Sequence, residues 1–434
     1  MPASVSISIS LVIFLWTAII IIHVATTVAL VARSQSSSLE QELKALNKTG
    51  WWGPWWSEET TLSSCELPGI VCNYDGSVEE INLNDFWIDS NSEQCYFGDF
   101  NFSSFPNLVR LNLARVGLRL RIPPEIGSVS KLTHLNLSRN LLSGELPLSL
   151  TNLTQLVKLD ISFNQMSGPI PLGLGNLKSL VELYMGGNYF NGTIPSTLGL
   201  LTSLTHLDLH LNQINSTIPV EVYNLKNLTT LHLGSNNLSG PISSKIGKVK
   251  NLVSLNLSDN ILSGSIPSTL GLLTSLTHLD LHSNHINGTI PIEMYNLKNL
   301  TTLHLGSNNL FGPISSKIGK LKNLVSLNLS DNILSGSIPS TLGLLTSLTH
   351  LDLHSNNLFG PLPPTLGCLK KLTHLFLDSN QINGSIPLEI GNMTKLRYLH
   401  LHNNSFTHPI PSTIGRMTKL VSLDLGVNNL VGTC

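Results

Sequence analysis

A repeat of 24 residues governs what this chain can fold into. From Asn107 onward the sequence divides into 24-residue units without insertion or deletion, thirteen complete and a fourteenth that stops at Cys434. In the unit KLTHLNLSRNLLSGELPLSLTNLT, which begins at Lys131, Leu stands at positions 2, 5, 7 and 12, Asn at 10, Gly at 14 and Pro at 17. One such unit cannot bury its own apolar side chains, so the units must stack into an elongated solenoid that shares a continuous core.

Each position of the unit has a physical role. The alternation x-Leu-x-Leu-x at positions 4 to 8 predicts a short strand whose Leu side chains point inward and whose neighbours point outward. We expect the Asn at position 10, from Asn140 to Asn428, to bind backbone groups of neighbouring coils that would otherwise be buried unpaired. Gly and Pro then fix the turn toward the convex side. The first unit departs from this pattern, with Val116 and Leu120 in place of Asn and Gly.

The repeat resembles a known family. Its L-x-x-L-x-L-x-x-N spacing is typical of leucine-rich repeats, and the phrase from Leu262 to Pro267, LSGSIP, resembles the plant-type repeat of receptor-like kinases and receptor-like proteins. Before the repeats, a helix-prone segment, paired tryptophans, Cys65 and Cys72 resemble the N-terminal cap of that family. The resemblance implies an α/β-type solenoid, a right-handed superhelix with a concave parallel β-sheet and a convex side of short 3-10 turns and loops.

The same comparison divides the chain into parts. We assign residues 33–77 to the plant-type cap, 78–106 to a degenerate first repeat and 107–434 to the solenoid. Residues 1–32 carry a long apolar run and are interpreted as a signal peptide or, alternatively, as an uncleaved signal anchor, although no Lys or Arg precedes the run. Both interpretations place the rest of the chain in the secretory pathway, either extracellular or on the outer face of the plasma membrane.

Cysteines and glycosylation sequons agree with export. Cys65 and Cys72 are assigned to a cap disulfide, whereas Cys95, Cys368 and Cys434 have no evident partner. Fifteen N-x-Ser/Thr sequons occur, many of them a by-product of the repeat consensus. We predict glycans at five of them: Asn47, Asn101, Asn191, Asn287 and Asn383.

Histidines are concentrated on the predicted concave face. Twelve of the fifteen fall at positions 4, 6 and 8, and a His-x-Asp-x-His triplet begins at His206, His278 and His350. Part of this concentration reflects duplication, since residues 203–274 and 275–346 differ at seven positions only. One interpretation is a polar filler that is hydrogen-bonded to adjacent aspartates.

Two other interpretations of the histidines remain. The face could be pH-sensitive, because an imidazole with an unperturbed pKa of about 6.5 gains charge in mildly acidic surroundings, while mutual repulsion lowers some of the pKa values. A metal site would need a cluster across coils, since positions 4 and 8 of one strand are ~13 Å apart and metal ligands bind at ~2 Å. The residues for such a cluster would be His374, Asp378, His400 and His402, but the sequence predicts neither a metal nor a cofactor.

The last coils before the partial unit offer the best binding patch, because they combine aromatic and polar side chains and are less repetitive than the copied block. We call these residues the C-terminal patch: His350, Asp352, His354, His374, Phe376, Asp378, Tyr398, His400 and His402. A smaller secondary patch consists of Phe163, Glu182 and Tyr184.

These features predict a binding protein rather than an enzyme. No Ser or Cys stands in a nucleophile turn, an open sheet excludes no water, and no phosphate loop or kinase signature occurs. Charged residues make up 12% of the chain and the formal net charge is −1, which argues against a nucleic-acid partner. The resemblance implies a receptor-like ectodomain that binds a peptide, a protein ligand or a co-receptor with leucine-rich repeats on its concave face. The alternatives are a secreted inhibitor of microbial wall-degrading enzymes and, because the chain stops within a repeat, a non-functional truncated receptor copy.

Overall fold

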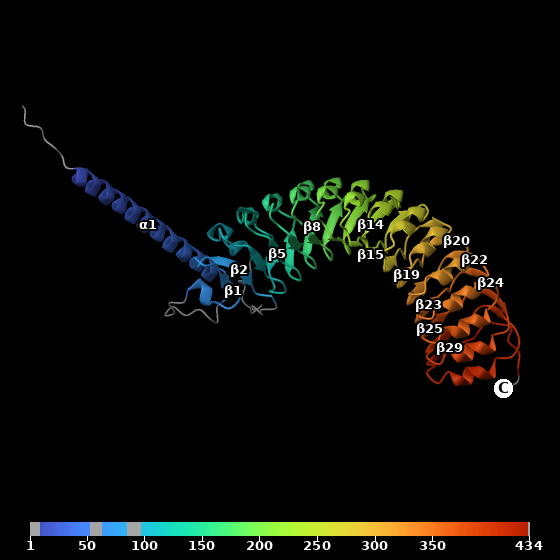
Figure 1. Cartoon of the computed structure of the whole chain (residues 1–434). Coiled ribbons are helices and arrows are strands. Elements are labelled where there is room, and N and C mark those ends of the chain that lie inside the picture. The colour runs from blue at the N-terminus through green and yellow to red at the C-terminus, as the bar shows by residue number, and fades with distance from the viewer. Residues whose placement is uncertain (1–8, 53–62, 85–96, 433–434) are drawn as a thin grey trace, which may run out of the picture.

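The computed structural model describes residues 9–52, 63–84 and 97–432. Stacked coils form an arch, and the long helix α1 (Ile9–Lys48) projects from the N-terminal end of that arch (Figure 1). Within the described residues no helix combines the length and the apolar character that crossing a membrane requires. Cys95 and Cys434 lie outside the described residues.

One sixteen-stranded sheet lines the inner side of the arch, with its strands in chain order (Figure 1). β1 (Ile70–Cys72) is antiparallel to β2, and all later neighbours are parallel, with the position-5 leucines in register, as Leu351 is with Leu375. This sheet and the short 3-10 turns confirm the predicted fold class. After β1 the strands are β2 (Val78–Asn82), β3 (Arg110–Asn112), β5 (His134–Asn136), β7 (Lys158–Asp160), β9 (Glu182–Tyr184), β11 (His206–Asp208), β13 (Thr230–His232), β15 (Ser254–Asn256), β17 (His278–Asp280), β19 (Thr302–His304), β21 (Ser326–Asn328), β23 (His350–Asp352), β25 (His374–Phe376), β27 (Tyr398–His400) and β29 (Ser422–Asp424).

A second set of parallel strands, which the sequence did not predict, follows the inner strands from β3 to β27. These strands lie around positions 11 to 15, where Gly and Pro had indicated only a turn, and they form a seven-stranded and a six-stranded sheet. Only one residue of each such strand, at position 12, points inward between two that point outward. This alternation is too short to be recognised as a strand from the sequence. The strands are β4 (Arg119–Leu120), β6 (Leu141–Gly144), β8 (Gln165–Pro169), β10 (Tyr189–Gly192), β12 (Gln213–Ser216), β14 (Asn237–Pro241), β16 (Ile261–Ser263), β18 (Asn287–Gly288), β20 (Asn309–Pro313), β22 (Ile333–Gly336), β24 (Asn357–Pro361), β26 (Gln381–Gly384) and β28 (Ser405–Phe406).

The chain then returns along the convex side through one short 3-10 helix per coil. In all thirteen solenoid helices that the structure describes, the N-cap is the Pro or Ser at position 17, in extended conformation. The solenoid helices are η5 (Pro124–Ser128), η6 (Leu148–Asn152), η7 (Leu172–Asn176), η8 (Ser196–Leu200), η9 (Val220–Asn224), η10 (Ser244–Lys248), η11 (Ser268–Leu272), η12 (Ile292–Asn296), η13 (Ser316–Lys320), η14 (Ser340–Leu344), η15 (Pro364–Cys368), η16 (Leu388–Asn392) and η17 (Ser412–Arg416), preceded by η2 (Ser64–Glu66), η3 (Phe97–Asp99) and η4 (Phe102–Ser104).

The N-terminal end of the core is closed by aromatic side chains. Trp51, directly after α1, stacks on Phe100 with ring centroids 5.4 Å apart, and Phe100 stacks on Phe105 at 4.8 Å. The buried carboxylate of Glu42 accepts hydrogen bonds from the Ser77 hydroxyl and the Val78 amide. Cys65 and Cys72 form a disulfide across this region, and Cys368 is an exposed free cysteine.

The asparagines at position 10 join each coil to the one before it, as predicted. The buried amide of Asn356 donates to the carbonyls of Leu329, Leu353 and His354 at 2.9 to 3.3 Å, and its oxygen accepts from the Leu334 amide at 3.0 Å. The same pattern recurs from Asn140 to Asn428. We call this series of bonds the Asn ladder.

We therefore predict that Asn356→Ala lowers the free energy of unfolding by about 2–4 kcal/mol, because each buried group left unpaired costs about 1–3 kcal/mol. Chemical denaturation measures this change. Asn357→Ala, one residue along and exposed, is the matched control and is expected to change stability by less than about 0.5 kcal/mol. Equal losses in the two variants would contradict the role of the ladder.

Position 14 adopts a left-handed backbone conformation in every coil, including the coils that lack Gly there. Within the copied block, Ser216 has φ 84° where the equivalent Gly288 has φ 86°. An L side chain pays about 1–2 kcal/mol in this region, whereas Gly does not.

We predict that Ser216→Gly raises the free energy of unfolding by about 0.5–1 kcal/mol and that Gly288→Ser lowers it by at least as much. The loss at Gly288 is larger because an added Cβ would lie 3.1 Å from the Ser265 side chain. Thermal denaturation of the two single variants checks both signs, and stabilisation by Gly288→Ser would refute the argument.

Candidate ligand-binding face

A column of stacked rings crosses three adjacent coils of the C-terminal patch. His350, His374 and Tyr398 occupy position 4 of β23, β25 and β27 and are paired in register. Their ring centroids are 4.2 and 4.7 Å apart, with planes inclined by 15° in both pairs. Parallel strands lie about 4.8 Å apart, so side chains at the same position of successive coils arrive at stacking distance without any distortion.

A second column lies beside it at position 6. Phe376 contacts His400 at 4.9 Å with rings tilted by 42°, and His374 meets Phe376 edge-on at 5.9 Å. The next coil orients His400, whose Nε2 is 3.0 Å from the Ser422 hydroxyl. These contacts make the patch a continuous surface of five rings, of which His350 is exposed and the other four are half-buried.

Charged pairs border the rings. His354 and His402 stand at position 8, just after their strands rather than within them. His354 Nδ1 is 2.6 Å from Asp352 Oδ1, and its Nε2 is 3.3 Å from Asp331 in the preceding coil. His402 lies between Asp378 at 3.7 Å and Asp424 at 3.1 Å. The structure therefore brings all nine residues of the predicted C-terminal patch together across three coils.

These surroundings shift the pKa values of two histidines of the patch in opposite directions. The hydrogen bond to Asp352 raises the pKa of His354 to about 9, against the opposing effect of burial. Burial, followed by the positive charges of His350 and Arg397, lowers the pKa of His374. The aspartate partners of His354 therefore favour its protonated form already at neutral pH, whereas burial disfavours the protonated form of His374.

The copied coils repeat the same pairing. His210 Nδ1 is 2.6 Å from Asp208, and His282 Nδ1 is 2.7 Å from Asp280. In both cases the aspartate hydrogen bond raises the pKa of the histidine.

Among the residues that the structure describes, no group of three His, Cys, Asp or Glu side chains is arranged to hold a metal ion. That finding covers the cluster of His374, Asp378, His400 and His402.

The residues of the secondary patch have partners that the sequence did not indicate: Glu182 and Tyr184 share one of them, and Phe163 has another. Lys158 forms an ion pair with Glu182 at 2.8 Å and lies 5.3 Å from the centre of the Tyr184 ring. The guanidinium of Arg139 covers Phe163 at 4.6 Å. Burial, together with the nearby carboxylates, raises the pKa of Tyr184 to about 12. These basic partners could have been predicted from one feature of the sequence, a basic residue that precedes an aromatic one by one coil.

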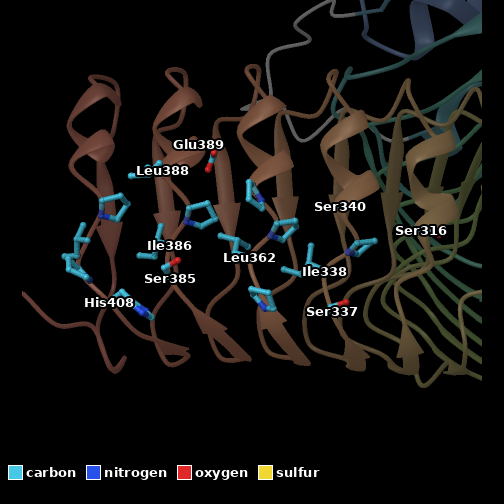
Figure 2. Close-up of a pocket in the computed structure, with 18 residues that line it drawn as sticks. Ser316, Ser337, Ile338, Ser340, Leu362, Ser385, Ile386, Leu388, Glu389 and His408 are labelled. Carbon is cyan, nitrogen blue, oxygen red and sulfur yellow. The ribbon is translucent and has the colours of Figure 1, made fainter.

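A groove of about 990 Å³ lies away from both patches, on the convex side of the C-terminal coils (Figure 2). The prolines at position 17, such as Pro363 and Pro387, line it together with Ile338, Leu362 and Ile386. It contains none of the residues predicted from sequence to bind a ligand, and the repetition of the Ile-Pro phrase along adjacent coils accounts for its length.

Comparisons with known proteins agree with this architecture. A family model described as a leucine-rich repeat region matches residues 305–432, and a leucine-rich-repeat model matches six segments between residues 131 and 297. No curated protein sequence matches the chain.

Solved structures extend the likeness. The plant peptide hormone receptor RGFR1, in complex with RGF2, is 33% identical over 84% of this chain and 61% of its own, with a TM-score of 0.74. A TDR receptor is 38% identical over 74% of this chain and 56% of its own, with a TM-score of 0.72. A leucine-rich-repeat protein of Leptospira interrogans is 33% identical over 76% and 80%, with a TM-score of 0.63. This chain thus spans about six tenths of the length of the two receptor chains.

Because the pKa values of His354 and His374 are shifted in opposite directions, we predict that the two histidines titrate separately. His354 should lose its proton near pH 9, and His374 should gain one only below its ordinary pKa of 6.5. Because the pKa of His354 is raised on folding, its stabilising effect is complete below pH 6.5 and disappears as the pH rises through about 9. NMR titration of labelled histidine rings checks both shifts, with His354→Gln and His374→Gln for assignment. A midpoint for His354 at or below 6.5 would refute the Asp352 pairing.

Proposed function

This chain belongs to the leucine-rich-repeat family, with repeats of the plant receptor type, and from that premise we propose that it is an extracellular, receptor-like binding module. Its ligand in this proposal is a peptide that lies across the C-terminal patch of the concave sheet. The binding involves no catalytic step and no cofactor.

The observation that carries the proposal is the pair of ring columns on β23, β25 and β27. A few residues supply most of the binding energy in protein interfaces, and aromatic side chains are enriched among them because they bury area with little loss of side-chain freedom. His350, His374 and Tyr398 are already held by stacking, so a ligand would not have to order them. The bordering Asp–His pairs offer charged hydrogen-bond partners on either side.

The likeness to RGFR1 supports a peptide as the ligand class. That structure is described as a peptide hormone receptor in complex with RGF2, and it shares its fold with 84% of this chain. Since this chain spans 61% of RGFR1, only the peptide-binding role is proposed here, not the further activities of a whole receptor.

Exposed sequons support the secretory location. Asn47, Asn101, Asn191, Asn287 and Asn383 are all exposed and therefore accessible to glycosylation. By contrast, Asn136, Asn256 and Asn328 lie half-buried on the concave sheet. We propose that these five of the exposed sequons carry glycans and leave the concave face open.

The proposal predicts that a photo-crosslinking phenylalanine analogue at Phe376 captures a peptide from extracellular plant fluid. Phe359, an exposed Phe on β24 in the neighbouring coil, is the matched control and should capture none. Tyr398→Ala should weaken capture at Phe376 by roughly 30-fold, since loss of a central aromatic costs about 2 kcal/mol or more. Mass spectrometry identifies the captured species.

Equal capture at Phe376 and Phe359, or capture that Tyr398→Ala leaves unchanged, would overturn the proposed site. Capture of a folded wall-degrading enzyme instead of a peptide would overturn the ligand class and favour a secreted inhibitor.

A further inference from the structure

Charge is segregated around each coil, although the whole chain is nearly neutral. All fifteen Lys and Arg residues from Lys178 onward stand at positions 19, 22, 24, 1 or 3 of the repeat. From Asn107 onward no Asp or Glu occurs at positions 20 to 24 or 1 to 3. Acidic side chains lie instead on and beside the concave strands, or at positions 15 and 19. The net charge of −1 therefore conceals a strongly basic surface.

This surface runs along one edge of the arch, where each 3-10 helix ends and the next inner strand begins. We call it the basic edge, represented by Lys226, Lys250, Lys298, Lys322 and Lys370 at position 24. All five are exposed, and within the described part of the chain none of them forms an ion pair. At about 4.8 Å per coil, the edge from Lys226 to Lys370 is roughly 30 Å long. Unpaired like charges in a row repel one another, so they favour a partner that neutralises them.

The composition of the edge points to the chemistry of that partner. Lys dominates and supplies point charges on flexible stems, unlike the rigid fork of Arg that reads a defined carboxylate or phosphate geometry. No aromatic residue stands at positions 22, 24, 1 or 3 from residue 107 onward, so stacking platforms for nucleic-acid bases are missing from these positions. The aromatic residues Trp and Tyr, which are enriched among the hot spots of protein interfaces, are missing from these positions for the same reason.

Between the lysines, hydrogen-bonding groups are aligned along the same edge. The Asn251 amide donates to the Lys226 carbonyl at 3.0 Å, and the Asn323 amide donates to the Lys298 carbonyl at 2.9 Å. These bonds hold each amide nitrogen against the backbone and leave the side-chain oxygen to accept from a hydroxyl. The edge thus presents ammonium groups and fixed hydrogen-bond acceptors, repeated at the spacing of the coils. A polymer that carries both carboxylates and hydroxyls is complementary to both kinds of group.

We propose that the basic edge binds a linear acidic polysaccharide, a chain of uronate sugars that lies along successive coils. Its carboxylates pair with the lysines and its hydroxyls bind the intervening Asn and Thr side chains. The contact is electrostatic and repetitive, and it is separate from the concave patch. The predicted glycans at Asn191, Asn287 and Asn383 stand at position 13, on the strands of the second set, and so leave the basic edge uncovered.

The test measures binding of the secreted full-length chain to linear polygalacturonate, with dextran as the neutral polymer, over a range of salt concentrations. The variant Lys248→Gln, Lys250→Gln, Lys320→Gln, Lys322→Gln removes four positive charges from two parts of the edge that lie three coils apart. The control Lys44→Gln, Lys48→Gln, Arg119→Gln, Arg121→Gln removes four charges elsewhere and has the same net charge. Circular dichroism verifies that both variants remain folded.

We expect the edge variant to bind polygalacturonate at least tenfold more weakly, with a shallower dependence of affinity on salt, because fewer counterions are released. The control variant should stay within twofold of the wild type, and dextran should not bind. Equal weakening in both variants would overturn the proposal, as would tighter binding to single-stranded DNA or phosphatidylserine vesicles than to polygalacturonate. Glycans found at Asn227 and Asn299, which stand on the edge itself, would also contradict it.

Discussion

The Asn ladder is the interaction on which the rest of the structure depends. Each position-10 amide binds carbonyls of its own coil and of the preceding one, as Asn356 does with Leu353 and Leu329. A coil without it would bury unpaired backbone groups, at a cost larger than any one of its apolar contacts offsets. The ladder also fixes the relative rotation of neighbouring coils, so one position of the repeat always arrives at the same place on the surface.

This regularity explains why function can reside in columns of side chains. Rings at position 4 stack because successive coils are spaced for stacking, and lysines at position 24 form a row for the same reason. The concave patch and the basic edge therefore use one scaffold for two kinds of recognition. Rings held on a rigid sheet suit a specific ligand, whereas a row of flexible ammonium groups suits a repetitive polymer.

Much of the fold follows from the sequence, since Leu at positions 2, 5 and 7 and Asn at position 10 admit few structures other than this solenoid. The second strands were missed because Gly144 and its equivalents signal a turn more strongly than one inward residue signals a strand. The sequence also brought His350, His374 and Tyr398 to one face, but it could not predict their contacts. The pKa of a position-8 histidine is raised chiefly by the aspartate at position 6 of its own strand, as Asp352 does for His354. Only the second carboxylate, Asp331 of the preceding coil, is brought to His354 by the stacking of the coils.

The central claim is that the ladder holds the C-terminal patch as a rigid surface, ready to bind without rearrangement. Hydrogen–deuterium exchange of the unliganded chain tests it most directly. The account predicts that the amides of β23, β25 and β27, and the ladder amides of Leu334 and Leu358, exchange as slowly as those at the centre of the solenoid. Rapid exchange confined to these coils would show that the patch is not ordered in advance and would contradict the account.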